Sequence, residues 1–134
     1  MPSLNPAPLA VALFLPDLKD LPDRRAAVDL AHGLLRAGVA VDVVAPMGGG
    51  PLRSALNPAV GQIDLAKRHA ATSALALARV MAERQPTLLS LPREVAWVGR
   101  LALWLARSDV RLVVMKGDAE ADFAAIRAAA PRWG

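Results

Sequence analysis

Residues 23–46, DRRAAVDLAHGLLRAGVAVDVVAP, carry the pattern that decides the fold of this chain. Apolar residues recur at helical spacing in the first half, and Gly38 then stands where a helix would end in a left-handed turn. The apolar run that follows, residues 39–45, predicts a buried strand. A second apolar run, residues 8–15, precedes the helix, so the segment completes a β-α-β unit that opens a parallel sheet.

The rest of the chain continues the alternation of strands and helices. Proline, glycine and polar residues separate the apolar runs, which favours short connections between the elements. We expect a loop at 46–58, strands at 60–65, 87–91 and 110–115, and helices at 67–84, 93–107 and 118–130. This alternation predicts an α/β fold, a Rossmann-like doubly wound parallel sheet of about five strands with helices on both faces and right-handed crossovers.

The length and composition favour one folded domain. A chain of 134 residues can bury a single core. Its apolar content of 54% and mean hydropathy of +0.34 favour folding over disorder. We expect the domain to cover residues 8–130, after a flexible leader over 1–7 and before a tail over 131–134.

The composition also excludes several classes of site. The chain has no cysteine, so disulfides and thiolate metal sites are excluded. His32 and His69 lie far apart without the spacing of a zinc site, so we expect no metal, and no cofactor motif is present. The formal charge of +4 comes from dispersed Lys and Arg, which predicts a solvated surface without a nucleic-acid partner. A weak preference for phosphates or for an acidic lipid surface is the alternative.

We expect a cytoplasmic location. No apolar run reaches the ~18–20 residues that span a bilayer, and the N-terminus lacks a signal-peptide pattern. Contact with the inner membrane as a peripheral protein is an alternative, and it depends on the helix over 93–107. That helix is apolar on most sides, because Trp97 and Trp104 lie among aliphatic residues. Arg100 lies between the two tryptophans in the sequence. These three residues are candidates for an interface with a protein partner, a second copy or a membrane, and core packing is the other explanation for the tryptophans.

Polar residues gather where the expected strands end, and ligands bind at that edge of a doubly wound sheet. The candidate substrate-binding residues are Asp17, Lys19, Asp20, Arg24, Arg25, Lys116 and Asp118. An aspartate after the first strand can serve as a general base toward an acceptor hydroxyl, or it can cap the helix. Asp20 before Pro22 suits the second role, as does Asp118 before the last helix. No residue is assigned as catalytic.

The glycine-rich loop 48–50 follows the second strand. A phosphate-binding loop is one reading, but neither GxxxxGK[ST] nor GxGxxG is present. We therefore expect a flexible connection, with ligand contact as the alternative.

A series of short motifs occurs in a fixed order along three quarters of the chain. They are LPDL at 15–18, DLAHGL at 29–34, RAGVAV at 36–41, GPLR at 50–53, VGQIDLAK at 60–67 and RQPTLLS at 84–90. This series resembles the N-terminal, acceptor-side domain of GT-B glycosyltransferases of the large retaining family 4. The resemblance implies transfer of a sugar from a nucleotide sugar to a lipid-linked or polysaccharide acceptor, with no further cofactor.

The sequence departs from that family where its chemistry concentrates. The family's glycine-rich turn before the first helix reads Lys-Asp-Leu-Pro at 19–22, and Arg24 replaces the family's acid. The family's histidines after strands four and five are replaced by the residues at 92–94 and 115–118. The donor-binding C-terminal domain is not in this sequence, so the resemblance implies that the chain alone does not turn over.

Two other functions are compatible with the sequence. The first is a non-catalytic Rossmann-like domain that binds a protein partner, or pairs with itself, through the helix over 93–107. The second is a flavodoxin-like module that binds a flavin or a nucleotide.

Overall fold

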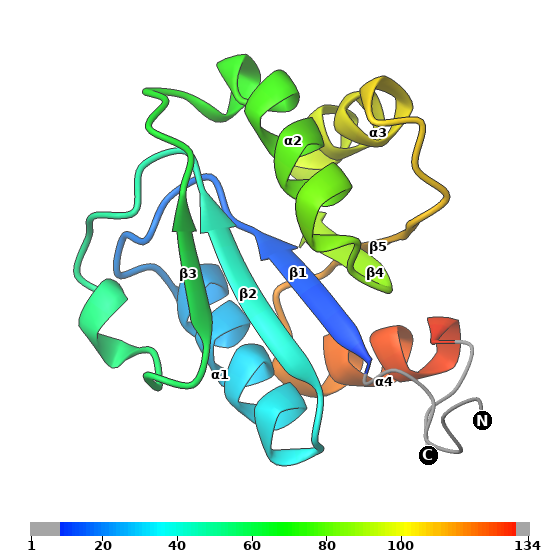
Figure 1. Cartoon of the computed structure of the whole chain (residues 1–134). Helices are drawn as coiled ribbons and strands as arrows, with labels where there is room; N and C mark the ends of the chain where they lie inside the picture. Colours follow the sequence, from blue (N-terminus) through cyan, green and yellow to red (C-terminus); the bar gives the residue numbers. More distant parts are fainter. Residues whose placement is uncertain (1–8, 131–134) are drawn as a thin grey trace.

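The computed structural model describes residues 9–130, which form a five-stranded parallel sheet between two pairs of helices (Figure 1). The strands are β1 (Ala10–Phe14), β2 (Ala40–Ala45), β3 (Gly61–Asp64), β4 (Leu88–Pro92) and β5 (Arg111–Met115). They lie in the order β3-β2-β1-β4-β5, and every neighbouring pair is parallel. The predicted Rossmann-like fold is confirmed, whereas the expected leader and tail lie outside the described residues.

The helices cover both faces of the sheet. They are α1 (Pro22–Arg36), α2 (Ala74–Arg84), α3 (Ala96–Leu105) and α4 (Ala119–Ala129). Helix α1 packs against α4 on one face, and α2 packs against α3 on the other (Figure 1). Three short 3-10 helices, η1 (Arg53–Ala55), η2 (Ala70–Thr72) and η3 (Arg93–Val95), lie in the connections.

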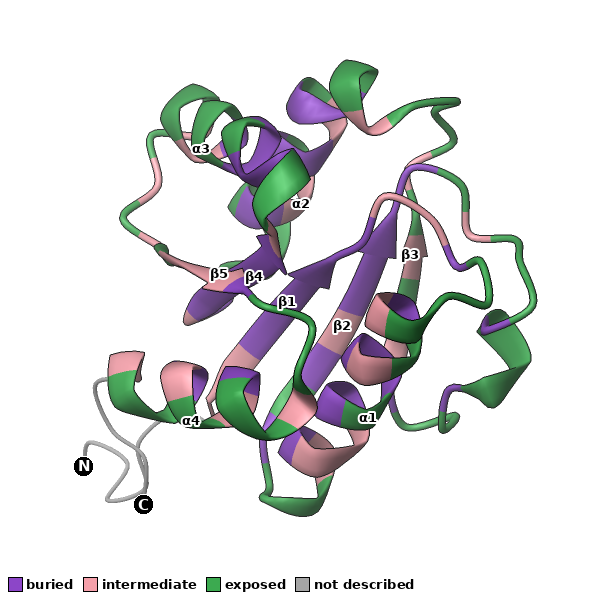
Figure 2. Ribbon diagram, turned by 180° about the vertical axis from the view of Figure 1, so that it is seen from behind, coloured by how far each residue is buried: buried purple, intermediate pink, exposed green. Residues whose placement is uncertain are grey.

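The all-apolar sequence of β1 is explained by burial on both faces. Val11 and Leu13 belong to the core beneath α1 and α4. Ala12 and Phe14 alternate with them and belong to the core beneath α2 and α3. Figure 2 shows the central strands buried along most of their length. A strand covered by helices on both sides needs apolar residues at every position, so the periodicity of a one-sided strand is absent.

Helix α1 ends as the sequence predicts. Its buried residues lie at helical spacing and include Leu30 and Leu34, which are at most 1% exposed. Gly38 has a φ of +84°, and the Val39 amide donates to the Leu34 carbonyl to close the turn. A residue without a Cβ adopts this φ at little cost, so glycine directs the chain into β2.

Two sequence-based details of the helices are wrong. Asp20 does not cap α1, because the residue at the N-cap is Leu21 and the Asp20 carboxylate instead pairs with Arg25. The expected helix over 67–84 begins only at Ala74. The Lys67 amide donates to the Pro46 carbonyl just after Ala66, which has a left-handed φ of +56°, and the 3-10 helix η2 follows, so the α-helix begins only beyond it.

Candidate functional site

The order of the strands creates a switch point between β1 and β4. The chain runs from β1 outward to β2 and β3, and then crosses the sheet to β4 and β5. The segments that follow β1 and β4 leave in opposite directions, and doubly wound sheets bind ligands in the crevice between such segments. Residues 15–21, 93–95 and 116–118, which follow β1, β4 and β5, therefore surround the candidate site.

Arg24, in the first turn of α1, is the centre of an ion-pair cluster at this edge. Its Nε and Nη2 atoms each lie 3.2 Å from one oxygen of Asp17, which makes a bidentate pair. Its Nη1 atom lies 3.4 Å from Glu94 Oε1 and also pairs with Asp23. The Arg24 side chain is only 9% exposed. Carboxylates from both sides of the switch point thus surround a nearly buried cation.

The pairing of Asp17 with Arg24 shifts the pKa values of both residues toward their charged forms. Burial opposes ionisation of Asp17, but the hydrogen bonds from Arg24 and the Lys19 amide, with the charges of both residues, hold the pKa of Asp17 below its ordinary value. Burial likewise opposes the charge on Arg24, and the hydrogen bond and charge of Asp17, with those of Asp23, raise its pKa nevertheless. The two shifts agree and describe one stable ion pair.

Asp20 and Arg25 form a separate, exposed pair beside this cluster. Arg25 Nη2 lies 2.8 Å from Asp20 Oδ2. The hydrogen bond from Arg25 lowers the pKa of Asp20, and Asp20 in turn raises the pKa of Arg25. A pair at the surface is screened by water, so it orders the turn between β1 and α1 rather than the core.

The loop between β5 and α4 is held by two aspartates. The buried carboxylate of Asp122 accepts hydrogen bonds from the Lys116 amide at 2.7 Å and the Gly117 amide at 3.1 Å. Asp118 caps α4, because its Oδ1 atom accepts from the amides of Glu120 and Ala121. The predicted capping role of Asp118 is confirmed. Because Asp122 already occupies two backbone donors, this loop does not offer them to a bound anion.

A pocket of about 200 Å³ opens between these segments. Its lining residues are Asp23, Ala27, Pro92, Arg93, Glu94, Met115, Lys116, Gly117 and Asp122. Asp23 and Glu94 bring negative charge that Arg24 partly neutralises, while the exposed residues Arg93 and Lys116 bring positive charge. Carboxylates accept hydrogen bonds from hydroxyl groups, and cationic side chains attract phosphates. The pocket is therefore suited to a polar ligand that carries both kinds of group.

The predicted site residues have four different roles in the structure. Lys116 lines the pocket. Asp17 and Arg24 lie behind it as the ion pair described above, and Asp118 caps α4. Asp20 and Arg25 pair with each other at the surface, and Lys19 is exposed in the same turn.

Sequence reasoning missed four polar residues of the pocket. Asp23, Arg93 and Glu94 line it, as does the buried Asp122. The position of Arg93 and Glu94 directly after β4 was a usable signal, because the end of that strand adjoins the end of β1. Asp122 gave no such signal, because it lies within α4. Its side chain meets the loop between β5 and α4 only in the folded chain.

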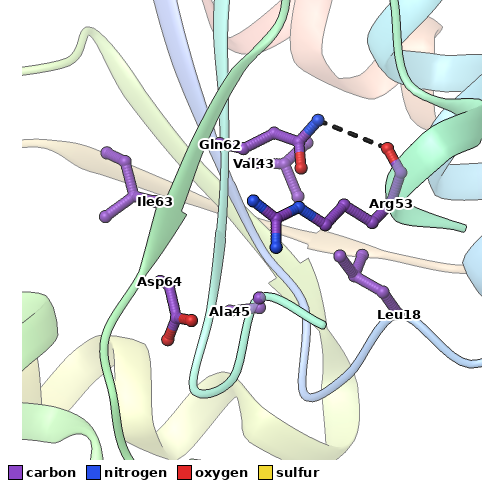
Figure 3. A pocket seen from close by; sticks show the side chains of 8 residues that line it. Leu18, Val43, Ala45, Arg53, Gln62, Ile63 and Asp64 are labelled. Carbon is purple, nitrogen blue, oxygen red and sulfur yellow. Dashed lines mark hydrogen bonds between the residues drawn. The ribbon is translucent and has the colours of Figure 1, made fainter. Parts of the chain in front are cut away.

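Gly50 of the glycine-rich loop lies close to the turn after β1, whereas Gly49 is exposed with open space around it. Gly50 has a φ of +144°, and a Cβ added there would lie 2.8 Å from the Leu18 carbonyl oxygen. The hollow beside the loop measures about 30 Å³, and Figure 3 shows Arg53 extending across it while the Gln62 side chain donates to the Arg53 carbonyl at 3.3 Å. At ~10–15 Å³ per water, such a volume holds only a few water molecules. The hollow beside the loop is therefore too small to cradle a phosphate group.

The histidines and Ser90 have structural partners or lie at the surface. His32 Nε2 accepts a hydrogen bond from the Asn57 amide at 3.0 Å, and His69 is exposed. The hydroxyl of Ser90, which is fully buried, donates to the Val113 carbonyl.

Among residues 9–130, no group of histidine, cysteine, aspartate and glutamate side chains is arranged to hold a metal ion. No helix within that range is long and apolar enough to cross a bilayer.

Helix α3 exposes its tryptophans. Trp97 is 51% exposed and Trp104 is 74% exposed, and Arg100 between them is also exposed. Val98 and Ala102, on the opposite side of the helix, are fully buried against the sheet. Core packing therefore explains one side of this apolar helix and leaves the tryptophan side without a covering element in the described chain.

Comparison with known proteins identifies similar folds only. No family profile matches the sequence, and no curated protein matches it significantly. A glycosyltransferase from Rickettsia africae ESF-5 superposes with a TM-score of 0.62 and 14% identity over 82% of this chain. MurG from Acinetobacter baumannii superposes with a TM-score of 0.56 and 18% identity over 87% of this chain.

The likeness confirms the fold expected from the sequence. The chain has an α/β Rossmann-like fold, like that of the part of each protein that it matches. It spans 30% of the length of the Rickettsia protein and 39% of that of MurG. At these identities the match concerns the fold alone, and it does not test the resemblance to family 4.

Proposed function

We propose that this chain is the acceptor-binding, N-terminal half of a GT-B glycosyltransferase of the family 4 type. The enzyme would transfer a sugar from a nucleotide sugar to a lipid-linked or polysaccharide acceptor. The observation that carries the proposal is the mixed-charge pocket at the carboxyl ends of β1, β4 and β5. Turnover would require a donor-binding half, supplied by further sequence or by another polypeptide.

The side chains of the pocket fit an acceptor that carries hydroxyl and phosphate groups. Asp23 and Glu94 are fixed by Arg24 on one side of their carboxylates and keep further lone pairs for sugar hydroxyls. Lys116 and Arg93 lie where they would attract an acceptor phosphate. The backbone between β5 and α4 is held by Asp122, so Lys116 projects from a rigid loop. The chain would thus bind and orient an acceptor, while the chemistry at the donor would belong to the other half.

Titration with two classes of ligand tests this division. We expect nucleotide sugars such as UDP-N-acetylglucosamine and GDP-mannose to bind no more tightly than about millimolar, an affinity worth only ~4 kcal/mol. A soluble glycosyl phosphate should shift the amide NMR signals of Glu94, Lys116 and Gly117. Lys116→Ala should weaken that binding, whereas Lys67→Ala, an exposed lysine beyond β3, serves as the matched control.

Two results would contradict the proposal in different ways. Micromolar binding of a nucleotide sugar would mean that the chain itself holds the donor. Signal shifts that avoid the pocket, or that survive Lys116→Ala unchanged, would mean that the acceptor site lies elsewhere.

An interaction role without catalysis is the second candidate function. The exposure of Trp97 and Trp104 favours it, since such large apolar side chains on one helix commonly mark a contact surface. This role is compatible with the first, because the pocket and the tryptophan side of α3 are built from largely different residues.

A further inference from the structure

Helix α3 carries one continuous apolar surface that faces away from the sheet. Its members are Trp97, Leu101, Trp104 and Leu105, which we call the α3 stripe, and they are 51%, 39%, 74% and 42% exposed. Their spacing places them on one side of the helix. The helix therefore buries one apolar side in its own core and presents a second one to its surroundings (Figure 2).

We propose that the α3 stripe binds the α3 stripe of a second copy of this chain, antiparallel, around a two-fold axis at Leu101. In a two-fold interface, contacts occur in equivalent pairs, so residues equally distant from the axis face each other. Leu101 would then meet its own counterpart. Trp97 of each copy would meet Leu105 and Trp104 of the other, which brings the most exposed side chains into contact.

The shape of the surface supports this arrangement. A hollow of about 590 Å³ lies at the C-terminal end of α3, lined by Leu103, Trp104, Leu105, Arg107 and Ser108. Trp97 projects near the other end of the same helix. In the antiparallel pair, the Trp97 indole of each copy lies opposite the hollow of the other copy. The same contact therefore occurs twice, once on each side of the axis. A large aromatic side chain seated in a pocket of the partner is the usual centre of such an interface.

The charges around the stripe complement each other in the same orientation. Arg93 lies in η3 just before α3, and Asp109 lies just after the turn that follows α3, both exposed, so antiparallel pairing brings these opposite charges to the same ends of the interface. Glu94 and Arg107 would lie near each other in the same way, although Glu94 also contacts Arg24. A parallel arrangement would instead bring like charges together at both ends.

The size of the surface suits a weak, reversible dimer. The four side chains of the stripe together expose roughly 400–500 Å² on each copy, on the scale of 150–250 Å² for a whole aromatic side chain. Two copies with their charged rims would bury on the order of 1,000 Å², the lower end for specific complexes. We therefore expect dissociation in the micromolar range.

A lipid surface is the competing occupant, and the charges favour it less. Arg93, Arg100 and Arg107 would be attracted to an anionic bilayer, but Glu94 and Asp109 lie beside the stripe at its two ends and would be repelled. In the dimer these acids have cationic partners, and Arg100 lies where it can stack on an indole of the other copy.

Sedimentation velocity of the full chain from about 1 to about 200 µM tests the proposal over the range expected for an interface of this size. The native chain should show a monomer–dimer equilibrium. Trp104→Glu should weaken it at least ~30-fold, the effect of losing a central aromatic contact. Met47→Glu is the matched control, because Met47 is 57% exposed and lies outside α3, and it should leave the equilibrium unchanged.

A charge exchange tests the register without touching the apolar residues. Arg93→Asp alone and Asp109→Arg alone should each weaken the dimer several-fold, and the double variant should restore it.

A native chain that stays monomeric at the highest concentration would overturn the proposal, as would a dimer insensitive to Trp104→Glu. Failure of the double variant to recover would overturn the antiparallel register, and pelleting of the monomer with anionic phosphatidylglycerol vesicles would assign the stripe to a membrane instead.

Discussion

At the scale of single residues, Arg24 shows how a position acquires its role from its neighbours. The sequence places it among candidate ligands, yet the fold buries its side chain among the carboxylates of Asp17, Asp23 and Glu94. Removing one partner from a buried ion pair leaves the other charge without compensation, which costs more than the intact pair contributes. Arg24 therefore organises the edge of the sheet, and the pocket uses the acids that it holds in place.

We expect Asp17→Asn to destabilise the protein by about 1–2 kcal/mol at pH 7, somewhat less than the ~1.5–3 kcal/mol of hydrogen bonds to charged groups, because water screens the Asp17 side chain, which is 30% exposed. The pKa of Asp17 is below its ordinary value in the folded protein, so folding favours its ionised form. This stabilisation is complete above the ordinary pKa and is lost as the pH falls through the lowered one. Urea unfolding at pH 7 and below about pH 4 should show the difference between native and variant shrinking in acid.

The control for this measurement is Asp29→Asn. Asp29 is exposed on α1, so its replacement should change the stability by less than ~0.5 kcal/mol at either pH. An Asp17→Asn effect of equal size at both pH values would show that packing, rather than the ion pair, accounts for it.

At the scale of elements, the two ends of α1 obey different rules. The C-terminal end depends on Gly38, whose φ of +84° is a local requirement visible in the sequence. The N-terminal end has Pro22 in its first turn but no side-chain cap, because the nearby Asp20 is occupied by Arg25. Local motifs thus locate the ends of a helix more reliably than they identify which side chain caps it.

Two alanine substitutions in and beside α1 should have opposite effects. Gly33→Ala should stabilise the protein by ~0.5–1 kcal/mol, because alanine favours the helix. The added Cβ would lie in ordinary contact, 3.6 Å from Phe123. Gly38→Ala should destabilise it by about 1–2 kcal/mol, because nothing obstructs the Cβ but the left-handed backbone disfavours it. Thermal unfolding of the two variants measures both signs, and a gain at Gly38 would contradict the turn described here.

At the scale of the whole molecule, stability is concentrated in the centre of the sheet. β1 lies between β2 and β4 and is buried on both faces, whereas β3 has four residues, forms an edge and alternates between half-buried and exposed residues. The slowest amide hydrogen exchange should therefore occur in β1 and β4, and the fastest among the strands in β3, because amides near the edge open locally without global unfolding. Mass spectrometry of peptic fragments measures this order, and equal protection of β3 and β1 would contradict it.

Most of the fold could be predicted, because the sequence patterns that specify it are local. The site could be predicted only in part, because its contacts join residues that are far apart in the sequence. The five strands and four helices of the structure lie within or close to the ranges predicted from apolar runs, and the late start of α2 is the main exception. Lys116 is the member of the predicted set that lines the pocket, while Asp23, Arg93, Glu94 and Asp122 were missed. Their importance depends on the adjacency of β1, β4 and β5, which no short stretch of sequence encodes.

The sequence by itself determined the alternation of strands and helices, the burial of β1 on both faces and the turn at Gly38, because hydrophobic periodicity and backbone preference act between near neighbours. Only the tertiary structure decided that Arg24 would meet Glu94, 70 residues away, and that Asp122 would hold the loop after β5. It also decided which side of α3 would remain uncovered. These outcomes follow from the order of strands in the sheet, which brings distant segments together at one edge and assigns each helix a face.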